Sequence, residues 1–201
     1  DKNTGELVGE DGSGASASAL HAAWSSLTYG KIAGKETLIW GGTDGFCYGY
    51  PNKTEKDADG YDLFMPSWKV DCNEPEYRID KDGKKVPYAT PPGPSELIGT
   101  PVLYEEKVYV AIGQDPEHGD GVGRLSCIDA KNGEVVWKYT DVGRTISTVS
   151  VHDDLVYVAE YAGLIHCLDA NDGKLYWTYD SFSRIWGSTL VAGGKVLLGN
   201  E

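Results

Sequence analysis

The sequence is poor in several residue types, and each scarcity limits what the protein can be. Its 201 residues include one methionine and three phenylalanines, and no apolar run is long enough to cross a bilayer. Only 18 lysines and arginines stand against 31 aspartates and glutamates, which gives a formal net charge of −13. A chain of this sign is repelled by nucleic-acid backbones and by anionic membranes. We therefore expect no nucleic-acid partner and no transmembrane segment.

Cysteine motifs are also missing. The four cysteines form no adjacent pair and no C-x-x-C or C-x-x-C-H motif, so zinc, thioredoxin-type and covalent-haem sites have no support. Cys127 and Cys167 occupy the same position in two repeats described below. Equivalent points on stacked sheets lie about 10 Å apart, whereas the Cα atoms of a disulfide lie within about 7 Å. We therefore predict that these two cysteines are unpaired and buried.

The chain is instead rich in glycine, tyrosine and tryptophan, and it repeats itself. Residues 123–137, GRLSCIDAKNGEVVW, return forty residues later as GLIHCLDANDGKLYW. A partial third copy, DKNTGELVG, opens the chain with Gly9 in place of the tryptophan. Self-similarity at this period indicates a repeat architecture. The copies match at five positions without gaps: Gly123/Gly163, Cys127/Cys167, Asp129/Asp169, Gly133/Gly173 and Trp137/Trp177.

Each copy has the pattern of a β-hairpin. Apolar and polar residues alternate before the turn, as in a strand, and a second apolar run follows it. Asn132-Gly133 and Asp172-Gly173 are turn signals, because glycine, asparagine and aspartate tolerate positive φ. The strong glycine and aromatic content suits many short strands joined by tight turns.

The copies resemble the PQQ-type β-propeller repeat, whose blades carry A-x-D-x-x-T-G-x-x-x-W at the turn between the third and fourth strands. The match holds at the aspartate, glycine and tryptophan, and it departs at the threonine, which is present only as Thr4. The resemblance implies an all-β propeller of four-stranded antiparallel blades. It also implies that Trp137 and Trp177 pack between neighbouring blades.

A second recurring element supports this interpretation. A bulky apolar residue followed by two small ones occurs four times, beginning at Trp24, Ile98, Ile146 and Trp186. We expect these segments in the innermost strands, where blades crowd near the axis. The whole chain is then one partial propeller domain over residues 1–201, with these parts: a blade tail over 1–9, blades over about 24–72, 98–140 and 146–180, and the start of another blade over 186–201.

About three and a half blades are fewer than the four to eight with which propellers close. The open sheet edges that result favour association. We expect the chain to be a segment of a larger propeller, and closure by a second copy, a homo-oligomer, is the alternative. Two long loops, 51–66 and 74–96, are either functional or solvated decoration of a blade edge.

Two arginines are candidates for a ligand site at the rim of the channel. Arg144 and Arg184 each stand two residues before an inner-strand segment, so they are expected at the same rim in adjacent blades. Two guanidinium groups there suit a carboxylate or phosphate. The alternative is pairing with the nearby Asp141 and Asp180. Glu160 ends a second strand and is expected to face the same mouth.

Other site candidates are weaker. Trp24 and Trp186 are placed to stack on a sugar or quinone, with packing as the alternative. Asp115, Glu117 and Asp120 lie in an oxygen-rich loop of the kind that binds calcium, but they lack the spaced D-x-D-x-D-G pattern. The chain shows no Ser-His-Asp, H-E-x-x-H or phosphate-loop arrangement, so no catalytic residue is predicted.

The resemblance implies two kinds of function. Quinoprotein dehydrogenases hold PQQ and calcium above the channel and oxidise alcohols or sugars, and many have an adjacent cysteine pair that this chain lacks. Other members are scaffolds of the bacterial envelope, such as the propeller lipoprotein of the outer-membrane assembly machinery. We predict a non-catalytic, cofactor-free scaffold that binds protein partners, periplasmic or extracellular. A PQQ- and calcium-dependent dehydrogenase and a carbohydrate-binding propeller are the alternatives.

Overall fold

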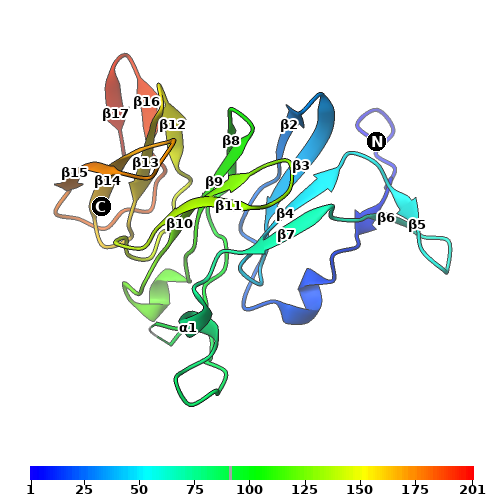
Figure 1. The fold of residues 1–201 in the computed structure, drawn as a ribbon, viewed down its shortest axis with the longest axis horizontal. Coiled ribbons are helices and arrows are strands. Elements are labelled where there is room, and N and C mark those ends of the chain that lie inside the picture. The colour runs from blue at the N-terminus through cyan, green and yellow to red at the C-terminus, as the bar shows by residue number, and fades with distance from the viewer. Residues whose placement is uncertain (91) are drawn as a thin grey trace.

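The computed structural model, which describes residues 1–90 and 92–201, is a fan of small antiparallel sheets (Figure 1). Three sheets have four strands, a two-stranded hairpin forms a fourth, and a separate three-stranded sheet, which contains one parallel pair, is the fifth. The predicted fold class is confirmed: the chain is an all-β propeller of four-stranded blades, and the described residues do not close a ring.

We name the three four-stranded sheets and the hairpin blades A to D in chain order. Blade A contains β2 (Thr28–Ile32), β3 (Lys35–Gly41), β4 (Phe46–Pro51) and β7 (Trp68–Asp71). Blade B contains β8 (Val102–Tyr104), β9 (Lys107–Ala111), β10 (Leu125–Asp129) and β11 (Val135–Tyr139). Blade C contains β12 (Ser150–His152), β13 (Leu155–Ala159), β14 (Leu164–Asp169) and β15 (Leu175–Asp180). Blade D begins with β16 (Leu190–Ala192) and β17 (Lys195–Leu197).

The sequence repeat is a repeat of strand register. Cys127 pairs with Tyr109 on one side and Trp137 on the other, and Cys167 pairs in the same way with Tyr157 and Trp177. Both third strands carry an irregularity directly after the cysteine. All four cysteines of the chain are free and buried.

The turn between the third and fourth strands explains the matched aspartate and glycine. The Asp129 carboxylate accepts the backbone N–H of Lys131 at 2.8 Å, and the Gly133 N–H donates to the Asp129 carbonyl at 2.9 Å. Gly133 has a φ of 78°, a conformation that glycine adopts without steric cost. Asp169 and Gly173 make the same turn in blade C.

The tryptophans of blades A and B pack on the turn of the next blade, as the resemblance implies. The Trp137 indole N–H donates to the Ala170 carbonyl at 3.0 Å. A Cβ placed on Gly173 would lie 2.6 Å from the Trp137 ring, so only glycine allows this contact. Trp68 makes the same bond to Ala130 at 3.0 Å. Trp68 is therefore the repeat tryptophan of blade A.

Neighbouring blades are joined near the channel by hydrogen bonds that recur at one position, each from a backbone N–H to a hydroxyl of the next blade. The Ser26 N–H donates to Thr100 Oγ1 at 3.2 Å, and the Thr100 N–H donates to Thr148 Oγ1 at 2.9 Å. The Thr148 N–H in turn donates to Ser188 Oγ at 3.0 Å. These small residues precede the innermost strands rather than lying within them, because their backbone bonds to the next blade instead of to its own sheet.

The two largest hydrophobic core clusters lie between blades A and B and between blades B and C. The insertion at 51–66 forms a hairpin of β5 (Glu55–Lys56) and β6 (Asp62–Phe64), and β1 (Glu10–Asp11) pairs parallel to β6. This small sheet, which we call the cap, lies at the blade A end of the fan (Figure 1). A short helix, η1 (Ala15–Ser18), follows β1.

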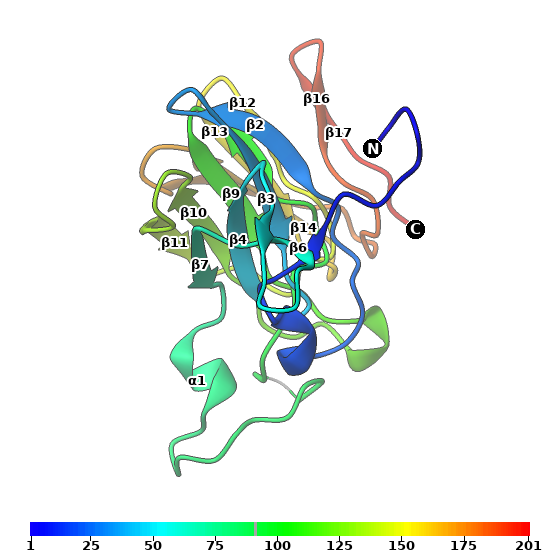
Figure 2. The ribbon, with the colours of Figure 1, turned by 90° about the vertical axis from the view of Figure 1, so that its right-hand side faces the viewer.

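One edge of the fan carries the long connections, and we call it the mouth face. It holds η1, η2 (Pro116–His118) and α1 (Pro75–Arg78), and the loop around α1 projects farthest (Figures 1 and 2). The β2–β3 and β16–β17 turns lie at the opposite edge. No helix in the described part of the chain is long and apolar enough to cross a membrane.

Candidate functional site

In three of the four blades, a charged residue stands two places before the inner-strand segment of one bulky and two small residues. The sequence puts Arg144 and Arg184 there, and the equivalent residue of blade B is Glu96, two places before Ile98. The backbone confirms the equivalence of Glu96 and Arg144. The Gly113 N–H donates to the Glu96 carbonyl at 2.9 Å, and the Tyr161 N–H donates to the Arg144 carbonyl at 2.8 Å.

The Arg144 side chain is buried and holds a loop in place, so it is not available to a ligand at the rim. Its side chain is among the largest that are fully buried. One terminal nitrogen, Nη2, donates to Gln114 Oε1 at 2.6 Å, while Nη1 donates to the carbonyls of Asp115, at 3.2 Å, and Gly119. Burial lowers the pKa of Arg144 below its usual value. The guanidinium therefore fixes the η2 loop to blade C.

Glu96 is the second buried charge-bearing group of the mouth face. The Tyr88 hydroxyl donates to its Oε1 at 3.0 Å, and Nδ1 of His21 lies 3.8 Å from the same oxygen. Its other oxygen, Oε2, is buried without a hydrogen-bond partner among the described residues. Burial raises the pKa of Glu96 to about 7, partly offset by the Tyr88 hydrogen bond. This carboxyl group therefore changes charge near neutral pH.

The Glu96 cluster ties three mouth segments together. Tyr88 comes from the long loop, and its hydroxyl also accepts the Asp115 N–H at 3.1 Å. The His21 ring stacks between Tyr88, with centroids 5.7 Å apart, and Trp24, at 6.1 Å. Gln114 donates to the carbonyls of Gly93 and Pro94 at 3.3 and 2.9 Å, which fixes the end of the long loop.

Glu160 does not join the two arginines. Its Oε1 lies 2.7 Å from Nε2 of His166, and both side chains are buried. Nδ1 of His166 faces the Tyr139 hydroxyl at 3.3 Å and Thr178 Oγ1 at 3.2 Å. The expectation that Glu160 faces the mouth with Arg144 gives way to a polar network between blades B and C. The reason is that His166, on the neighbouring strand, offers a buried partner for the carboxylate.

Arg184 and the two exposed tryptophans line the mouth face more loosely. Arg184 Nη1 donates to the Tyr161 hydroxyl at 2.9 Å, and the guanidinium lies over the Tyr161 ring at 5.1 Å. Trp186 packs edge-on against the same ring and donates to Glu201. Trp24 and Trp186 are each 53% exposed, so their role in stacking on a sugar stays a prediction.

The alternative in which the two arginines pair with nearby aspartates is not observed either. Among residues 1–90 and 92–201, neither Arg144 nor Arg184 forms a salt bridge with Asp141 or Asp180. The guanidinium groups bond instead to the Gln114 side chain, to backbone carbonyls and to the Tyr161 hydroxyl.

The described residues do not offer a metal centre that fits the quinoprotein alternative. They contain no group of three or more histidine, cysteine, aspartate and glutamate side chains that could hold a metal ion. The Asp115 carboxylate accepts the Glu117 N–H at 2.9 Å and so shapes its own loop. Arg144 and Gln114 bond each other instead of facing a ligand. We therefore derive no step through PQQ or calcium.

Sequence reasoning missed two residues that the structure brings forward. Glu96 has the same offset from its channel segment as the two arginines, so that offset was a usable signal. Trp68 is separated from its blade by the 51–66 insertion, which hides the motif spacing. Tyr88 and His21 carry no sequence signal, because they belong to irregular loops that meet only in the fold.

Comparison with known proteins confirms the resemblance to PQQ-like propellers. The family model described as "Outer membrane protein assembly factor BamB" matches residues 68–159 and 121–201. BamB from Moraxella catarrhalis is similar in structure, with a TM-score of 0.55 and 17% identity, over 90% of this chain and 45% of that one. Quinohemoprotein alcohol dehydrogenase from Comamonas testosteroni follows with a TM-score of 0.52 and 15% identity, over 85% of this chain and 32% of that one.

The chain thus spans less than half the length of either solved structure, and at these identities the likeness shows the fold alone. No curated protein matches the sequence. The two family-model matches together cover residues 68–201, more than half of the chain. On that ground the chain belongs to the family described as outer membrane protein assembly factor BamB.

Proposed function

We propose that this propeller segment is a protein-interaction scaffold of the bacterial envelope, periplasmic or extracellular, which presents its mouth-face loops to a protein partner. The observation that carries the proposal is how the mouth's polar groups are used. The hydrogen bonds that Arg144, Gln114 and Glu96 do make all hold loops in place, as described above. A catalytic site needs such groups aimed at a substrate, whereas a docking surface needs firmly held loops.

The long loop around α1 is the part best placed to meet a partner. It is anchored at its base, where the Asn73 side chain bonds the backbone of Ser95 through its carbonyl, at 2.7 Å, and its amide, at 2.8 Å. Glu74, buried beside Arg124 at 3.4 Å, also accepts from Lys138. A rigid base allows the tip to bind without a large ordering cost.

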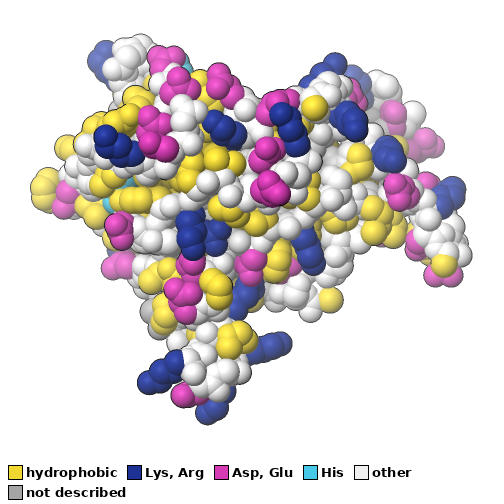
Figure 3. Space-filling model, in the orientation of Figure 1, with side chains coloured by type: hydrophobic (Ala, Val, Ile, Leu, Met, Phe, Trp, Pro, Cys, Tyr) yellow, Lys and Arg dark blue, Asp and Glu magenta, His cyan; other side chains and the backbone are white. Residues whose placement is uncertain are grey.

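The tip of this loop has its own chemistry. Ile79 pairs with Lys85, and Asp80 accepts the N–H groups of Asp82 and Lys84 at 2.9 Å, so the tip is a small hairpin. Ile79 is 44% exposed. Lysine and arginine side chains gather at the projecting end of the molecule, with acidic and apolar ones among them (Figure 3). An exposed apolar residue among charged ones is the usual anatomy of a small protein contact.

Site-specific photo-crosslinking tests the proposal. A benzophenone amino acid at Lys84, in the tip, is expected to give a discrete crosslink to a subunit of the outer-membrane protein assembly machinery. The same amino acid at Lys35, the first residue of β3 beside the β2–β3 turn at the opposite edge, is the matched control and should give none.

The competing enzyme function has its own readout. Added PQQ and calcium are expected to leave the absorption spectrum unchanged from that of free PQQ, with no dye-linked oxidation of alcohols or sugars. Tight quinone binding with turnover, or equal crosslinking from Lys84 and Lys35, would overturn the scaffold proposal.

A further inference from the structure

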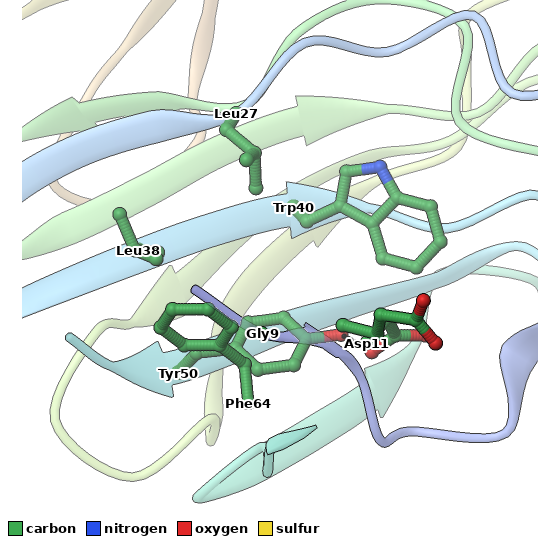
Figure 4. Close-up of a pocket in the computed structure, with 8 residues that line it drawn as sticks. Gly9, Asp11, Leu27, Leu38, Trp40, Tyr50 and Phe64 are labelled. Carbon is green, nitrogen blue, oxygen red and sulfur yellow. Dashed lines mark hydrogen bonds between the residues drawn. The ribbon is translucent and has the colours of Figure 1, made fainter. Parts of the chain in front are cut away.

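Blade A has a cavity on each of its two faces. The one beneath the cap has the Trp40 indole on one side and the Tyr50 and Phe64 rings on the other (Figure 4). The equivalent faces of blades B and C pack against the preceding blade, so this cavity is not evidence for a ligand site. The second cavity, of about 330 Å³, lies at the junction of blades A and B, and its lining residues fall between Ile32 and Lys131. Both blades of that junction have all four strands.

The next junction, between blades B and C, shows which side chains fill the equivalent space. Tyr109 and the repeat tryptophan Trp137 flank the same residue of the third strand, with ring centroids 6.0 Å apart. The Tyr109 hydroxyl donates to the Ala170 carbonyl at 2.9 Å, and the Trp137 indole donates to the same oxygen at 3.0 Å. Lys107, two residues before the tyrosine, reaches Asn171 Oδ1 at 2.8 Å. A phenol and a long side chain thus cross from blade B to the turn of blade C.

Blade A has shorter side chains at both of these positions. Its register puts Ile39 in the place of Tyr109 and Thr37 in the place of Lys107. Blade C keeps a tyrosine at this position, Tyr157, so blade A is the exception. Isoleucine and threonine lack the length to cross to the next turn, which leaves the space between the blades open.

The lining of the cavity matches this comparison. It lies between Thr37 of blade A and the turn residues Ala130 and Lys131 of blade B, which correspond to the two acceptor residues of blade C. Ile32 and Trp68, both buried, add apolar walls. The volume falls within the usual range of small-ligand pockets. The cavity therefore occupies the region that a phenol ring helps to fill at the next junction.

The Ala130 carbonyl has an acceptor position that its counterpart uses. It accepts the Trp68 indole N–H at 3.0 Å, and no hydroxyl of the described residues donates to it. The Ala170 carbonyl, by contrast, accepts both an indole and a phenol. A carbonyl oxygen has two lone pairs, so the second bond is available at Ala130 as well.

We propose that this cavity binds a small phenol. The ring lies beside the repeat tryptophan Trp68, and the hydroxyl donates to the Ala130 carbonyl, as the Tyr109 hydroxyl does to Ala170. The site lies at the A–B junction beside the β2–β3 turn, at the edge opposite the mouth-face loops. This proposal and the scaffold proposal can therefore fail separately.

Fluorine NMR titration with three probes that share one ring tests the role of the hydroxyl. 4-Fluorophenol is expected to bind about fivefold more tightly than fluorobenzene, a difference set by one hydrogen bond. 4-Fluoroanisole keeps the oxygen but has no hydrogen to donate, so it should bind no more tightly than fluorobenzene.

Variants locate the binding. Ser67→Phe, from an exposed residue that lines the cavity, should block the space and abolish binding of 4-fluorophenol. Val136→Phe is the matched control, because this exposed residue also precedes the repeat tryptophan of its blade, and it should leave the affinity unchanged. Ile39→Tyr, which restores the residue of blades B and C, should abolish binding by placing a covalent phenol in the cavity.

Equal affinity for 4-fluorophenol and fluorobenzene, or no binding of 4-fluorophenol at millimolar concentration, would overturn the proposal. Unchanged binding in Ser67→Phe would do the same, because the probe would then sit elsewhere. Circular dichroism checks that each variant is folded, and Ser67→Phe decides the matter if Ile39→Tyr is not.

Discussion

Trp137 and Trp177 occupy the same position in neighbouring blades, yet only one of them is buried. Trp137 is 9% exposed and Trp177 is 41% exposed, although each pairs with the equivalent cysteine of its own blade. The difference lies in the next blade. Blade C supplies a carbonyl and a glycine turn for Trp137, whereas the described residues of blade D supply no such turn for Trp177.

The same contrast extends to whole strands. β15, the fourth strand of blade C, is exposed along its full length, while β11, the fourth strand of blade B, buries Trp137 and half-buries Tyr139. Burial in this fold is therefore a property of the junction between blades. A blade that is complete in itself still depends on its neighbour to cover its outer tryptophan.

The largest expected effect is the loss of a tryptophan at a complete junction. Trp137→Ala should lower the free energy of unfolding by about 4 kcal/mol, because it opens a cavity and leaves the Ala170 carbonyl without its donor. Trp177→Ala should cost about 1 kcal/mol, because that side chain is already half exposed. Urea unfolding followed by circular dichroism measures both, and equal losses would contradict the junction argument.

Glu96 gives the next largest effect, and it depends on pH. Its pKa is raised to about 7 in the folded chain, so the folded state binds the proton more tightly than the unfolded state does. Its contribution is complete below the unfolded pKa of about 4.5 and is lost as pH rises through 7. At about 1.4 kcal/mol per pH unit, the full loss is about 3.5 kcal/mol.

The Glu96→Gln variant isolates this contribution, because a neutral amide has no proton to release. Its stability between pH 5 and 8 should fall by about 2.5 kcal/mol less than that of the original chain. The measurement is a series of urea unfolding curves at half-unit pH steps, and identical slopes for the two chains would contradict it.

The junction also predicts an effect at the turn glycines. Gly133→Ala and Gly5→Ala place a side chain at nearly the same positive φ, 78° and 75°. A Cβ on Gly133 would lie 2.9 Å from the Trp68 ring, whereas Gly5 has open space around it. Gly133→Ala should therefore cost about 2 kcal/mol more than Gly5→Ala, the usual cost of overpacking. Thermal unfolding of the two variants makes the comparison.

The smallest expected effect concerns the hydroxyl groups near the channel. Thr148→Val removes the acceptor of the Thr100 N–H and should cost about 1 kcal/mol. Thr140→Val, at an exposed position, should change stability by less than about 0.5 kcal/mol. Amide hydrogen exchange at Thr100 would report the same loss locally, and unchanged protection there would show that the bond is not formed in solution.

The repeat residues and the site residues differ in how far the sequence predicted them. Asp129, Gly133 and Trp137 were predicted with their roles, because their turn chemistry is local and recurs at a fixed spacing. Arg144 and Arg184 were placed at one rim by the same spacing, but their partners were not foreseen. Gln114, Tyr88 and Tyr161 come from loops of unequal length, where spacing carries no information.

The insertion at 51–66 is a segment whose structure the sequence did not predict. Its length and charge predicted either a functional loop or surface decoration, and neither describes the cap that it forms with β1. The parallel pair Glu10↔Leu63 joins residues more than fifty positions apart, and neither segment carries a sequence pattern that predicts pairing with the other.

By itself, the sequence determined the strands, the turns and the order of the blades, because these follow from alternation, turn residues and a repeat whose period is close to forty. Tertiary structure alone decided that Glu160 contacts His166, that the Glu96 side chain is buried from solvent, and that an aromatic cavity forms beneath the cap. The reason is physical: hydrogen bonding, desolvation and cavity shape depend on which side chains meet across blades and loops, and those meetings are set by packing rather than by neighbours in the chain.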